Sequence, residues 1–328
     1  MNGQVSIISD PVRIASALSV WAVVVAYDRD FQLDRLLCRL ISQTRLLAGI
    51  VVVDNANLSS TAAVVRTKGA TYIAAATNLG GAGGFALGML FALAQGADLL
   101  WLWDDDGYPE GDQCLALLEG HLDAVDADLV APMVVSDEDP SHTAFIFRLP
   151  GLRTNERAAV ERHETIDGFA HLFNGALLRA KTLGRLGLPD FRLFIRGDEV
   201  DFHLRLQRMG GRIVTFTKAV ARHPSGRNDI ARIPGTSFSV VMPANPDRRP
   251  VTFRNRGYIF LRHRQWLFLL TDPLRYALYF LLRRHPDWGG YRDWWAATLT
   301  GYRGLFAEPY FLARQPAGTP GETLKDCT

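Results

Sequence analysis

The stretch Asp98–Asp106, DLLWLWDDD, is an apolar run that ends in three consecutive acids. Two similar runs precede it, WAVVVAY at 21–27 and IVVVD at 50–54, and a shorter one covers 71–76. Segments with the helical spacing of apolar residues lie between them. This alternation of buried strands and helices predicts an α/β fold, with a single Rossmann-like, mostly parallel sheet flanked by helices.

Polar residues follow each of these predicted strands. In sheets of this kind, ligands bind beyond the carboxyl ends of the strands. We therefore expect one cleft to be lined by Tyr27, Asp54, Asn55, Asn78 and the run Asp104–Asp106.

The second half of the chain has a less regular pattern. It contains predicted strands at 128–135 and 212–217, an apolar segment at 169–179 and a helix at 198–209. From about residue 225 the composition changes, and residues 254–284 combine seven Arg and one acid, Asp272, with Trp, Phe, Leu and Tyr. We predict one domain over residues 1–225 and a mostly helical C-terminal region over residues 226–328.

The composition excludes several classes of protein. With 328 residues, 48% of them hydrophobic and 21% charged, the chain can build a folded core and is not a disordered protein. Its 36 Lys and Arg nearly balance 34 Asp and Glu, which argues against a protein that coats nucleic acid. Three cysteines, Cys38, Cys114 and Cys327, do not make a disulfide framework and favour a reducing, cytosolic compartment.

Neither a secretory signal nor a spanning helix is expected. Residues 1–11 lack a basic start and an apolar core, and the apolar segment 266–282 is interrupted by Asp272, Pro273 and Arg275. Basic residues that alternate with Trp, Tyr and Leu are instead typical of helices in a membrane interface. They would hold the protein peripherally on the cytoplasmic face of the plasma membrane. The alternative is a helical pack whose apolar face is buried against the first domain.

Asp104 and Asp106 are candidates for binding a divalent cation. Alternate residues of a strand point to the same side, so both carboxylates can reach one ion. Oxygen ligands suit Mg²⁺ or Mn²⁺ shared with substrate phosphates. The alternative is an acidic turn, which the mutual repulsion of three adjacent acids disfavours. His223 either completes the site as a neutral imidazole or forms a local hydrogen bond.

A glycine-rich segment, NLGGAGGF at 78–85, is expected to form a loop before a helix at 85–95. Its backbone N–H groups can approach a phosphate closely, helped by the helix dipole. A tight turn that packs the helix against the sheet explains the same glycines. The segment also matches the G-x-G-x-x-A dinucleotide fingerprint, although that fingerprint belongs after the first strand and this segment follows the third.

A second group of acids, Asp198, Glu199 and Asp201, stands at the start of the predicted helix at 198–209. Asp198 can cap this helix, with Asp201 as a capping-box partner. Glu199 can instead face the cleft as a general base, and one such carboxylate is enough for an inverting displacement. The residues alone leave both interpretations open.

Taken in order from residue 21 to 223, these features resemble the inverting family-2 glycosyltransferases of the GT-A fold. The stretches NLGGAGGFALGMLFALAQGAD, RLFIRGDEVDFHLRL and RNRGY are more specific. They resemble the galactofuranosyltransferases that initiate actinobacterial cell-wall galactan. The resemblance implies transfer of galactofuranose from UDP-galactofuranose to a rhamnosyl-N-acetylglucosaminyl-diphospho-polyprenol acceptor.

The resemblance also implies roles for individual residues. Asp54 would bind the uracil of the UDP-sugar. The nucleotide and sugar would be neighboured by Asn78, Gly80, Gly81, Gly83, Gly84, Asp104 and Asp105. A divalent metal, Mn²⁺ or Mg²⁺, would be held by Asp104, Asp106 and His223. Glu199 would be the catalytic base, at a position where many members of the family have Asp.

Three other functions are compatible with the residues. A glycosyltransferase of the same fold that uses another sugar, such as a rhamnosyltransferase, would share every residue named. An NAD(P)-dependent oxidoreductase would rest on the glycine fingerprint, and a non-catalytic membrane-binding module on the C-terminal region. The sequence leaves open the acceptor hydroxyl, the number of sugars added and the oligomeric state, with a homo-oligomer among the options.

Overall fold

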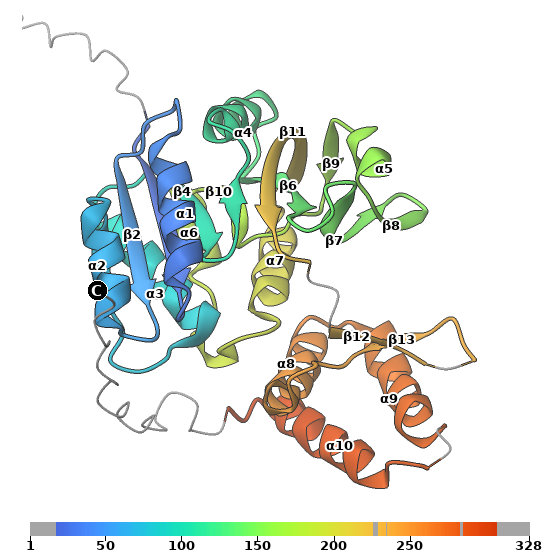
Figure 1. Ribbon diagram of the computed structural model, residues 1–328. Coiled ribbons are helices and arrows are strands. Elements are labelled where there is room, and N and C mark those ends of the chain that lie inside the picture. Colours follow the sequence, from blue (N-terminus) through green and yellow to red (C-terminus); the bar gives the residue numbers. More distant parts are fainter. Residues whose placement is uncertain (1–17, 226–228, 234, 283–284, 307–328) are drawn as a thin grey trace, which may run out of the picture.

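The computed structural model describes residues 18–225, 229–233, 235–282 and 285–306. Cys327 and Arg283–Arg284 lie outside the described residues, as do residues 1–11. Within the described part, eleven strands form one sheet that carries helices on both faces (Figure 1). The sequence prediction of an α/β fold is therefore confirmed.

Most elements that the sequence predicted lie close to the expected bounds, apart from α3 and the strand expected at 212–217, which extends to His223. The strands between residues 142 and 167 were not predicted. The strands of the sheet are β1 (Val20–Ala26), β2 (Gly49–Asp54), β3 (Thr71–Ala74), β4 (Leu99–Asp104), β5 (Tyr108–Pro109), β6 (Leu129–Ser136), β7 (His142–Leu149), β8 (Leu152–Glu156), β9 (Thr165–Asp167), β10 (Asn174–Arg179) and β11 (Ile213–His223). The helices of this part are α1 (Asp30–Ile41), α2 (Ser59–Thr67), α3 (Gly80–Ala94), α4 (Cys114–Ala124), α5 (Arg157–Glu161), α6 (Ala180–Leu186), η1 (Phe191–Leu193) and α7 (Asp198–Arg208).

The sheet has the strand order β3-β2-β1-β4-β10-β6-β11-β5. Strand β1 runs parallel to β2 and β4, and β6 runs parallel to β11. Strand β10 lies antiparallel between β4 and β6, so the sheet is mostly, not wholly, parallel. In this register Ala26 pairs with Asp54 and Val25 with Asp104. The carboxyl ends of β1, β2 and β4 therefore meet at one edge, as the sequence predicted.

Helices cover both faces because side chains alternate along each strand. On one face α1, α2 and α4 pack against residues that include Val24 and Trp101. On the other face α3, α6 and α7 pack against residues that include Val23 and Leu102. The two buried clusters hold the sheet edge, and the residues that follow it, in a fixed place.

Helix α3 begins at Gly80, earlier than the start at Phe85 that the sequence suggested. A Cβ added at Gly84 would lie 2.7 Å from Val25, and one at Gly88 would lie 2.5 Å from Val23. These distances are well inside van der Waals contact, so any side chain there would push α3 away from β1. The expected loop at 80–84 is thus wrong, and the interpretation as close helix–sheet packing is correct.

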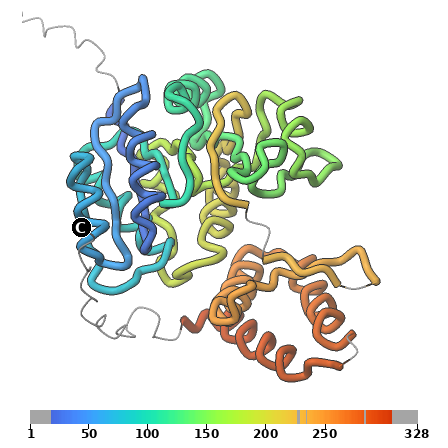
Figure 2. The backbone as a smooth tube through the Cα atoms, viewed as in Figure 1, coloured from blue at the N-terminus to red at the C-terminus, as the bar shows by residue number. Residues whose placement is uncertain are grey.

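The C-terminal residues form a lobe of their own, coloured orange to red in Figure 2. Its elements are β12 (Ile230–Arg232), β13 (Ser239–Val241), η3 (Pro246–Arg248), α8 (Arg249–Arg262), α9 (Trp266–Leu281) and α10 (Trp288–Tyr302). Phe253, Tyr276 and Trp294 belong to a hydrophobic cluster separate from the two that cover the sheet. Among the described residues, no helix is both long enough and apolar enough to cross a bilayer.

Candidate active site

The three acids that end the run DLLWLWDDD have different surroundings. Strand β4 ends at Asp104, so the alternation of side chains along a strand does not extend to Asp106. Asp105 is 3% exposed and accepts hydrogen bonds from the backbone N–H of Tyr27 at 2.7 Å and from Arg29 Nη1 at 2.8 Å. Burial raises the pKa of Asp105 to about 6, although Arg29 opposes the shift. Asp105 therefore anchors the β1–α1 loop, and its expected place beside a UDP-sugar stays a prediction.

Asp106 and His223 lie together although they are far apart in the sequence. Oδ1 of Asp106 is 3.0 Å from Nε2 of His223, and Oδ2 accepts a hydrogen bond from Arg29 at 2.8 Å. Burial by itself would lower the pKa of His223 and raise that of Asp106. The contact between the two side chains outweighs burial, so the pKa of His223 is raised and that of Asp106 is lowered. Nδ1 of His223 donates to the carbonyl of Pro224 at 2.6 Å. Metal-binding imidazoles are commonly oriented by such a backbone contact.

Asp104 adds a further carboxylate to this region. Burial, followed by the charges of Asp106 and Glu199, raises its pKa well above the usual range. The distance of 3.0 Å between Asp106 Oδ1 and His223 Nε2 is that of a hydrogen bond between the two side chains. Carboxylate and imidazole donors are of the chemical type that a divalent cation takes, although no three His, Cys, Asp or Glu side chains of the described chain are grouped as a metal site.

Asp54, at the end of β2, is fully buried. Its carboxylate accepts hydrogen bonds from the backbone N–H groups of Ala56 and Leu58 and from the hydroxyl of Tyr72, each at 2.9 Å. Burial, reinforced by the hydrogen bond to Asp54, raises the pKa of Tyr72 to about 12. Asp54 thus shapes the β2–α2 loop, and its contact with the uracil of a UDP-sugar stays a prediction.

The glycine-rich segment presents less backbone to the cleft than expected. Oδ1 of Asn78 accepts a hydrogen bond from the N–H of Gly80 at 2.8 Å, so this N–H already has a partner. Of the four glycines predicted to neighbour a nucleotide, Gly80, Gly83 and Gly84 are buried and Gly81 is partly exposed. The sites open to a ligand are therefore reduced to the neighbourhood of Asn78 and Gly81.

Glu199 lies in the first turn of α7. Gly197 is the N-cap residue and Asp198 is the first helical residue, so Asp198 does not cap the helix as one interpretation supposed. Oε1 of Glu199 accepts a hydrogen bond from the N–H of Phe173 at 3.3 Å. Burial raises the pKa of Glu199 despite this bond, and burial with the charge of Glu199 raises the pKa of Asp198 to about 7.

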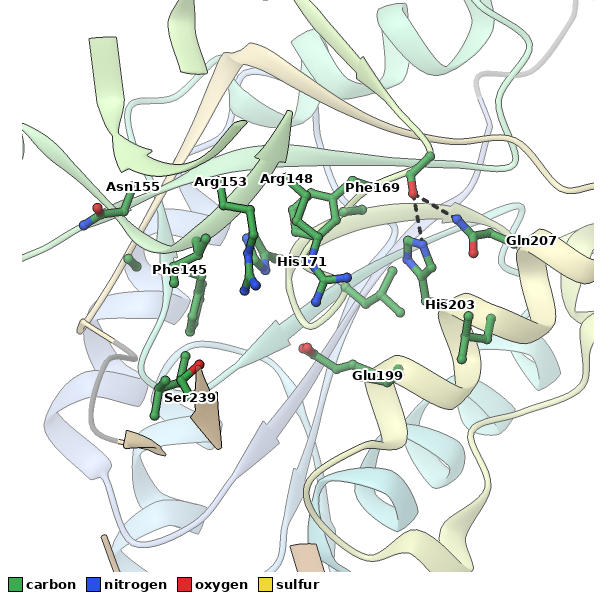
Figure 3. Close-up of a pocket in the computed structure, with 18 of the residues that line it drawn as sticks. Phe145, Arg148, Arg153, Asn155, Phe169, His171, Glu199, His203, Gln207 and Ser239 are labelled. Carbon is green, nitrogen blue, oxygen red and sulfur yellow. Dashed lines mark hydrogen bonds between the residues drawn. The ribbon is translucent and has the colours of Figure 1, made fainter. Parts of the chain in front are cut away.

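A cleft of about 1200 Å³ opens beside Glu199 (Figure 3). Its walls come from β7, β8, the segment before β10, α7 and the β12–β13 hairpin of the C-terminal lobe. In Figure 3, Glu199 extends from α7 toward the space that Arg148, Arg153 and His171 also face. Glu199 lines this cleft, and its charge also acts on Asp104. It therefore lies between the acidic sheet edge and the cleft.

The loop that leads into α7 is strained. Phe194 and Arg196 have φ angles of 65° and 66°, a region that non-glycine residues seldom occupy. Each such residue costs about 1–3 kcal/mol, so surrounding contacts must hold the loop in place. The carbonyl of Phe194 accepts a hydrogen bond from the N–H of Ala82 at 3.0 Å, which ties the loop to the start of α3.

Asn255 of α8 supplies the main contacts that hold this loop. Its side chain is fully buried, and Nδ2 donates to the carbonyls of Leu193, Ile195 and Arg196 at 2.7, 3.0 and 2.8 Å. The C-terminal lobe thus positions the residues just before Glu199. The role of Asn255 was not anticipated from the sequence, although the RNRGY resemblance contained it. Nothing in the sequence singled out Arg29.

Asp201 makes a second link between α7 and α8. It is fully buried, its Oδ1 lies 2.8 Å from Nε2 of His263, and its Oδ2 accepts a hydrogen bond from Arg205 at 2.8 Å. The expected capping-box role of Asp201 is therefore wrong. Its carboxylate instead joins the helix that carries Glu199 to the C-terminal lobe.

Residues 21–176 match the family described as Glycosyl transferase family 2. The chain is 41% identical over 300 residues to a galactofuranosyltransferase of Mycobacterium tuberculosis, covering 89% of this chain and 98% of the relative. It is 39% identical over 297 residues to a galactofuranosyltransferase of Mycolicibacterium smegmatis, covering 88% of this chain and 97% of the relative.

The fold has solved counterparts among glycosyltransferases. One is the crystal structure of GalNAc-T7 with UDP, GalNAc and Mn²⁺, which is similar over 85% of this chain and 55% of that one. The TM-score is 0.55 at 14% sequence identity. At this identity the likeness concerns the fold alone, and it agrees with the GT-A fold expected from the sequence.

Replacement of Asn255 tests its hold on the strained loop. In Asn255→Ala, three carbonyls of the loop lose their donor, and we expect the free energy of unfolding to fall by about 2–4 kcal/mol. Asn255→Asp should be at least as damaging, because a carboxylate would face those carbonyls without an N–H. Urea unfolding measures the loss, and hydrogen exchange should show faster exchange over residues 193–199.

Asn245→Ala provides the matched control, since exposed Asn245 only caps the short helix η3. It should cost no more than about 1 kcal/mol. Wild-type stability and exchange rates in Asn255→Asp would contradict the assignment.

Proposed function

The chain belongs to the galactofuranosyltransferases of glycosyl transferase family 2, and from this membership we propose its reaction. It transfers galactofuranose from UDP-galactofuranose to a rhamnosyl-N-acetylglucosaminyl-diphospho-polyprenol, with inversion, in the initiating step of cell-wall galactan synthesis. The observation that carries the proposal is the position of Glu199. This carboxylate lines a large cleft on one side and interacts with Asp104 of the acidic sheet edge on the other.

The donor belongs on the acidic side of Glu199. A divalent cation, Mn²⁺ or Mg²⁺, would be held there by Asp104, Asp106 and His223, whose carboxylate oxygens and imidazole nitrogen suit such an ion. When bound, the cation would offset the charge of the donor diphosphate. Asn78 and Gly81 are the parts of the glycine-rich segment that remain open to the nucleotide-sugar.

The acceptor belongs in the cleft, where its hydroxyl meets Glu199. The carboxylate takes the hydroxyl proton while the acceptor oxygen forms a bond to the anomeric carbon. The bond from that carbon to the diphosphate oxygen breaks, and its electron pair leaves with UDP. A single displacement through an oxocarbenium-like transition state inverts the anomeric centre. Burial suits Glu199 to this task, because a base with a raised pKa accepts a proton more readily near neutral pH.

The exposed apolar surface of the C-terminal lobe suits attachment to a membrane that contains a polyprenol-linked acceptor. On α9, Leu267, Leu270 and Leu274 are 69%, 78% and 60% exposed and follow one another at helical spacing. Trp266 and Trp288 are similarly exposed. An apolar stripe with aromatic and basic neighbours is typical of helices that lie in the bilayer interface. We infer that α9 holds the enzyme peripherally on the cytoplasmic face of the plasma membrane.

The competing functions have less support. The oxidoreductase alternative rested on the glycine fingerprint, but its Gly81 and Gly83 lie within α3, which follows the third strand and not the first. A rhamnosyltransferase would use the same base and acids, so donor specificity has to be measured directly. Parallel assays with UDP-galactofuranose and dTDP-rhamnose separate the two, and transfer from dTDP-rhamnose alone would overturn the proposal. Linkage analysis of the product by NMR identifies the acceptor hydroxyl.

Glu199→Gln tests the base. The amide keeps the shape but cannot take a proton, so kcat should fall by about 10³-fold while UDP-galactofuranose binding persists. In the wild type, kcat should fall with decreasing pH at a higher pH than a free glutamate would give, because burial raises the pKa of Glu199. Exposed Glu161→Gln is the control for loss of a carboxylate. Normal turnover of Glu199→Gln would remove Glu199 from this role.

Asp106→Ala tests the metal site. In Mn²⁺, the affinity for UDP should weaken by about 10- to 100-fold, because a carboxylate ligand and the partner of His223 are both lost. In EDTA, the variant and the wild type should bind UDP equally. Asp112→Ala, in an exposed loop, serves as the control in the same titration calorimetry. An unchanged metal dependence in Asp106→Ala would count against the site.

Substitution of the exposed leucines of α9 tests membrane attachment. Replacing Leu267, Leu270 and Leu274 together by Ser should lower binding to anionic vesicles at least about tenfold, because each buried leucine contributes about 1.5–3 kcal/mol. Folding should be unaffected, since these side chains are exposed. Leu90→Ser, on exposed α3 surface, should bind vesicles like the wild type. Undiminished vesicle binding by the triple variant would refute the role of α9.

A further inference from the structure

The β7–β8 hairpin presents two different faces. Phe147 and Leu149 point into a buried cluster, whereas alternate residues on the opposite face line the cleft beside Glu199. On this cleft face, Arg148 pairs directly with Arg153 across the two strands. Both side chains extend into the space that Glu199 also faces (Figure 3).

This arginine pair is electrostatically unfavourable in the absence of a ligand. Like charges directly opposite each other on neighbouring strands destabilise a hairpin. Within the described part of the chain, neither arginine has a carboxylate partner or a side-chain hydrogen bond. Burial, followed by the charge of Arg153, lowers the pKa of Arg148. The fold thus holds two cations together without compensating them.

A third arginine reaches the same cleft from the C-terminal lobe. Arg232 ends β12 and lines the cleft opposite the β7–β8 hairpin. The two acids of the lining are Asp167, which pairs with Arg212 at 3.3 Å, and Glu199 itself. The ion pair between Arg196 and Asp229 ties the start of this hairpin to the loop before α7. The cleft therefore has the carboxylate of Glu199 at one place and, at another, three guanidinium groups that no acid among the described residues neutralises.

We propose that Arg148, Arg153 and Arg232 bind the diphosphate group of the acceptor. Guanidinium groups match phosphate oxygens through paired hydrogen bonds, and a diphosphate supplies enough charge for three of them. This inference rests on the proposed function, which puts a diphosphate-linked sugar acceptor in the cleft. The donor diphosphate has its own place at Asp104 and Asp106, on the other side of Glu199. The arginines thereby fix the distance between the lipid-linked end of the acceptor and the hydroxyl that Glu199 deprotonates.

The test compares two acceptors that differ only in the diphosphate. One is the rhamnosyl-N-acetylglucosamine disaccharide on a short-chain lipid diphosphate, and the other is the same disaccharide as a neutral alkyl glycoside. In Arg148→Gln and Arg153→Gln, the KM for the diphosphate acceptor should rise about tenfold each, and more in the double variant. Both kcat and the KM for UDP-galactofuranose should stay unchanged. With the neutral acceptor, kcat/KM should not change.

Two further variants sharpen the comparison. Arg153→Lys keeps the charge but loses the paired hydrogen bonds, so its KM should fall between those of wild type and Arg153→Gln. Arg162→Gln, an exposed arginine outside the cleft, should behave as wild type. The thermal midpoint of Arg148→Gln/Arg153→Gln should not fall, because a repulsive pair has been removed. Equal losses with both acceptors, or no loss with the diphosphate acceptor, would overturn the proposal.

Inorganic pyrophosphate separates the anion site from the proposed reaction. With UDP and Mn²⁺ saturating the donor site, pyrophosphate should bind the wild type in titration calorimetry and fail to bind Arg148→Gln/Arg153→Gln. That result supports the arginine site even if no galactofuranose is transferred. If galactofuranose is transferred but pyrophosphate does not bind, and the variants lose no more activity with the diphosphate acceptor than with the neutral one, the arginine site is refuted. The proposed reaction would still stand. Binding of inorganic phosphate that does not compete with the diphosphate acceptor would assign the arginines to free phosphate and also refute the proposal.

Discussion

The burial of several carboxylates at one edge of the sheet is the constraint on which the candidate site depends. Asp104, Asp105 and Asp106 follow β4, and Asp198 and Glu199 open α7 close by. The structure offsets this charge in part, with Arg29 on two of the acids and His223 on one. Burial, followed by the charges of neighbouring acids, raises the pKa values of Asp104 and Asp198, and burial raises that of Glu199. Such a region gains most from a bound cation, and it keeps a buried carboxylate ready to accept a proton.

The C-terminal lobe contributes to the candidate active site as well as being a candidate membrane anchor. Asn255 holds the strained loop before Glu199, and His263 contacts Asp201 three positions from Asp198 along the same helix. The β12–β13 hairpin closes one wall of the cleft. A lobe that both meets the bilayer and positions the base would couple membrane attachment to the geometry of the reaction.

Much of the fold could be read from the sequence because its signals are local. Apolar runs such as Asp98–Trp103, and the helical spacing after them, depend only on neighbours along the chain. Asp106, His223 and Glu199 were candidates from their places after strands and at a helix start, and the family resemblance supplied the roles that remain predictions. The loop expected at residues 80–84 was wrong, since glycine also permits close helix packing, and the loop-shaping hydrogen bonds of Asp54 were not anticipated. The hydrogen bonds of Asp54 and the closeness of Gly84 to Val25 involve partners that periodicity does not specify.

The sequence by itself thus determined the fold class, the family and the candidate base, because each is encoded in short contiguous patterns. Only the tertiary structure decided which side chains meet. It brought Asp106 to His223 and Asn255 to the loop before α7, and it set Arg148 opposite Arg153 beside the cleft that Glu199 lines. Those contacts join segments far apart in the chain, and their formation depends on strand order and helix packing. A hydrogen bond or a charge pair acts over a few ångströms of space, whatever the separation in sequence.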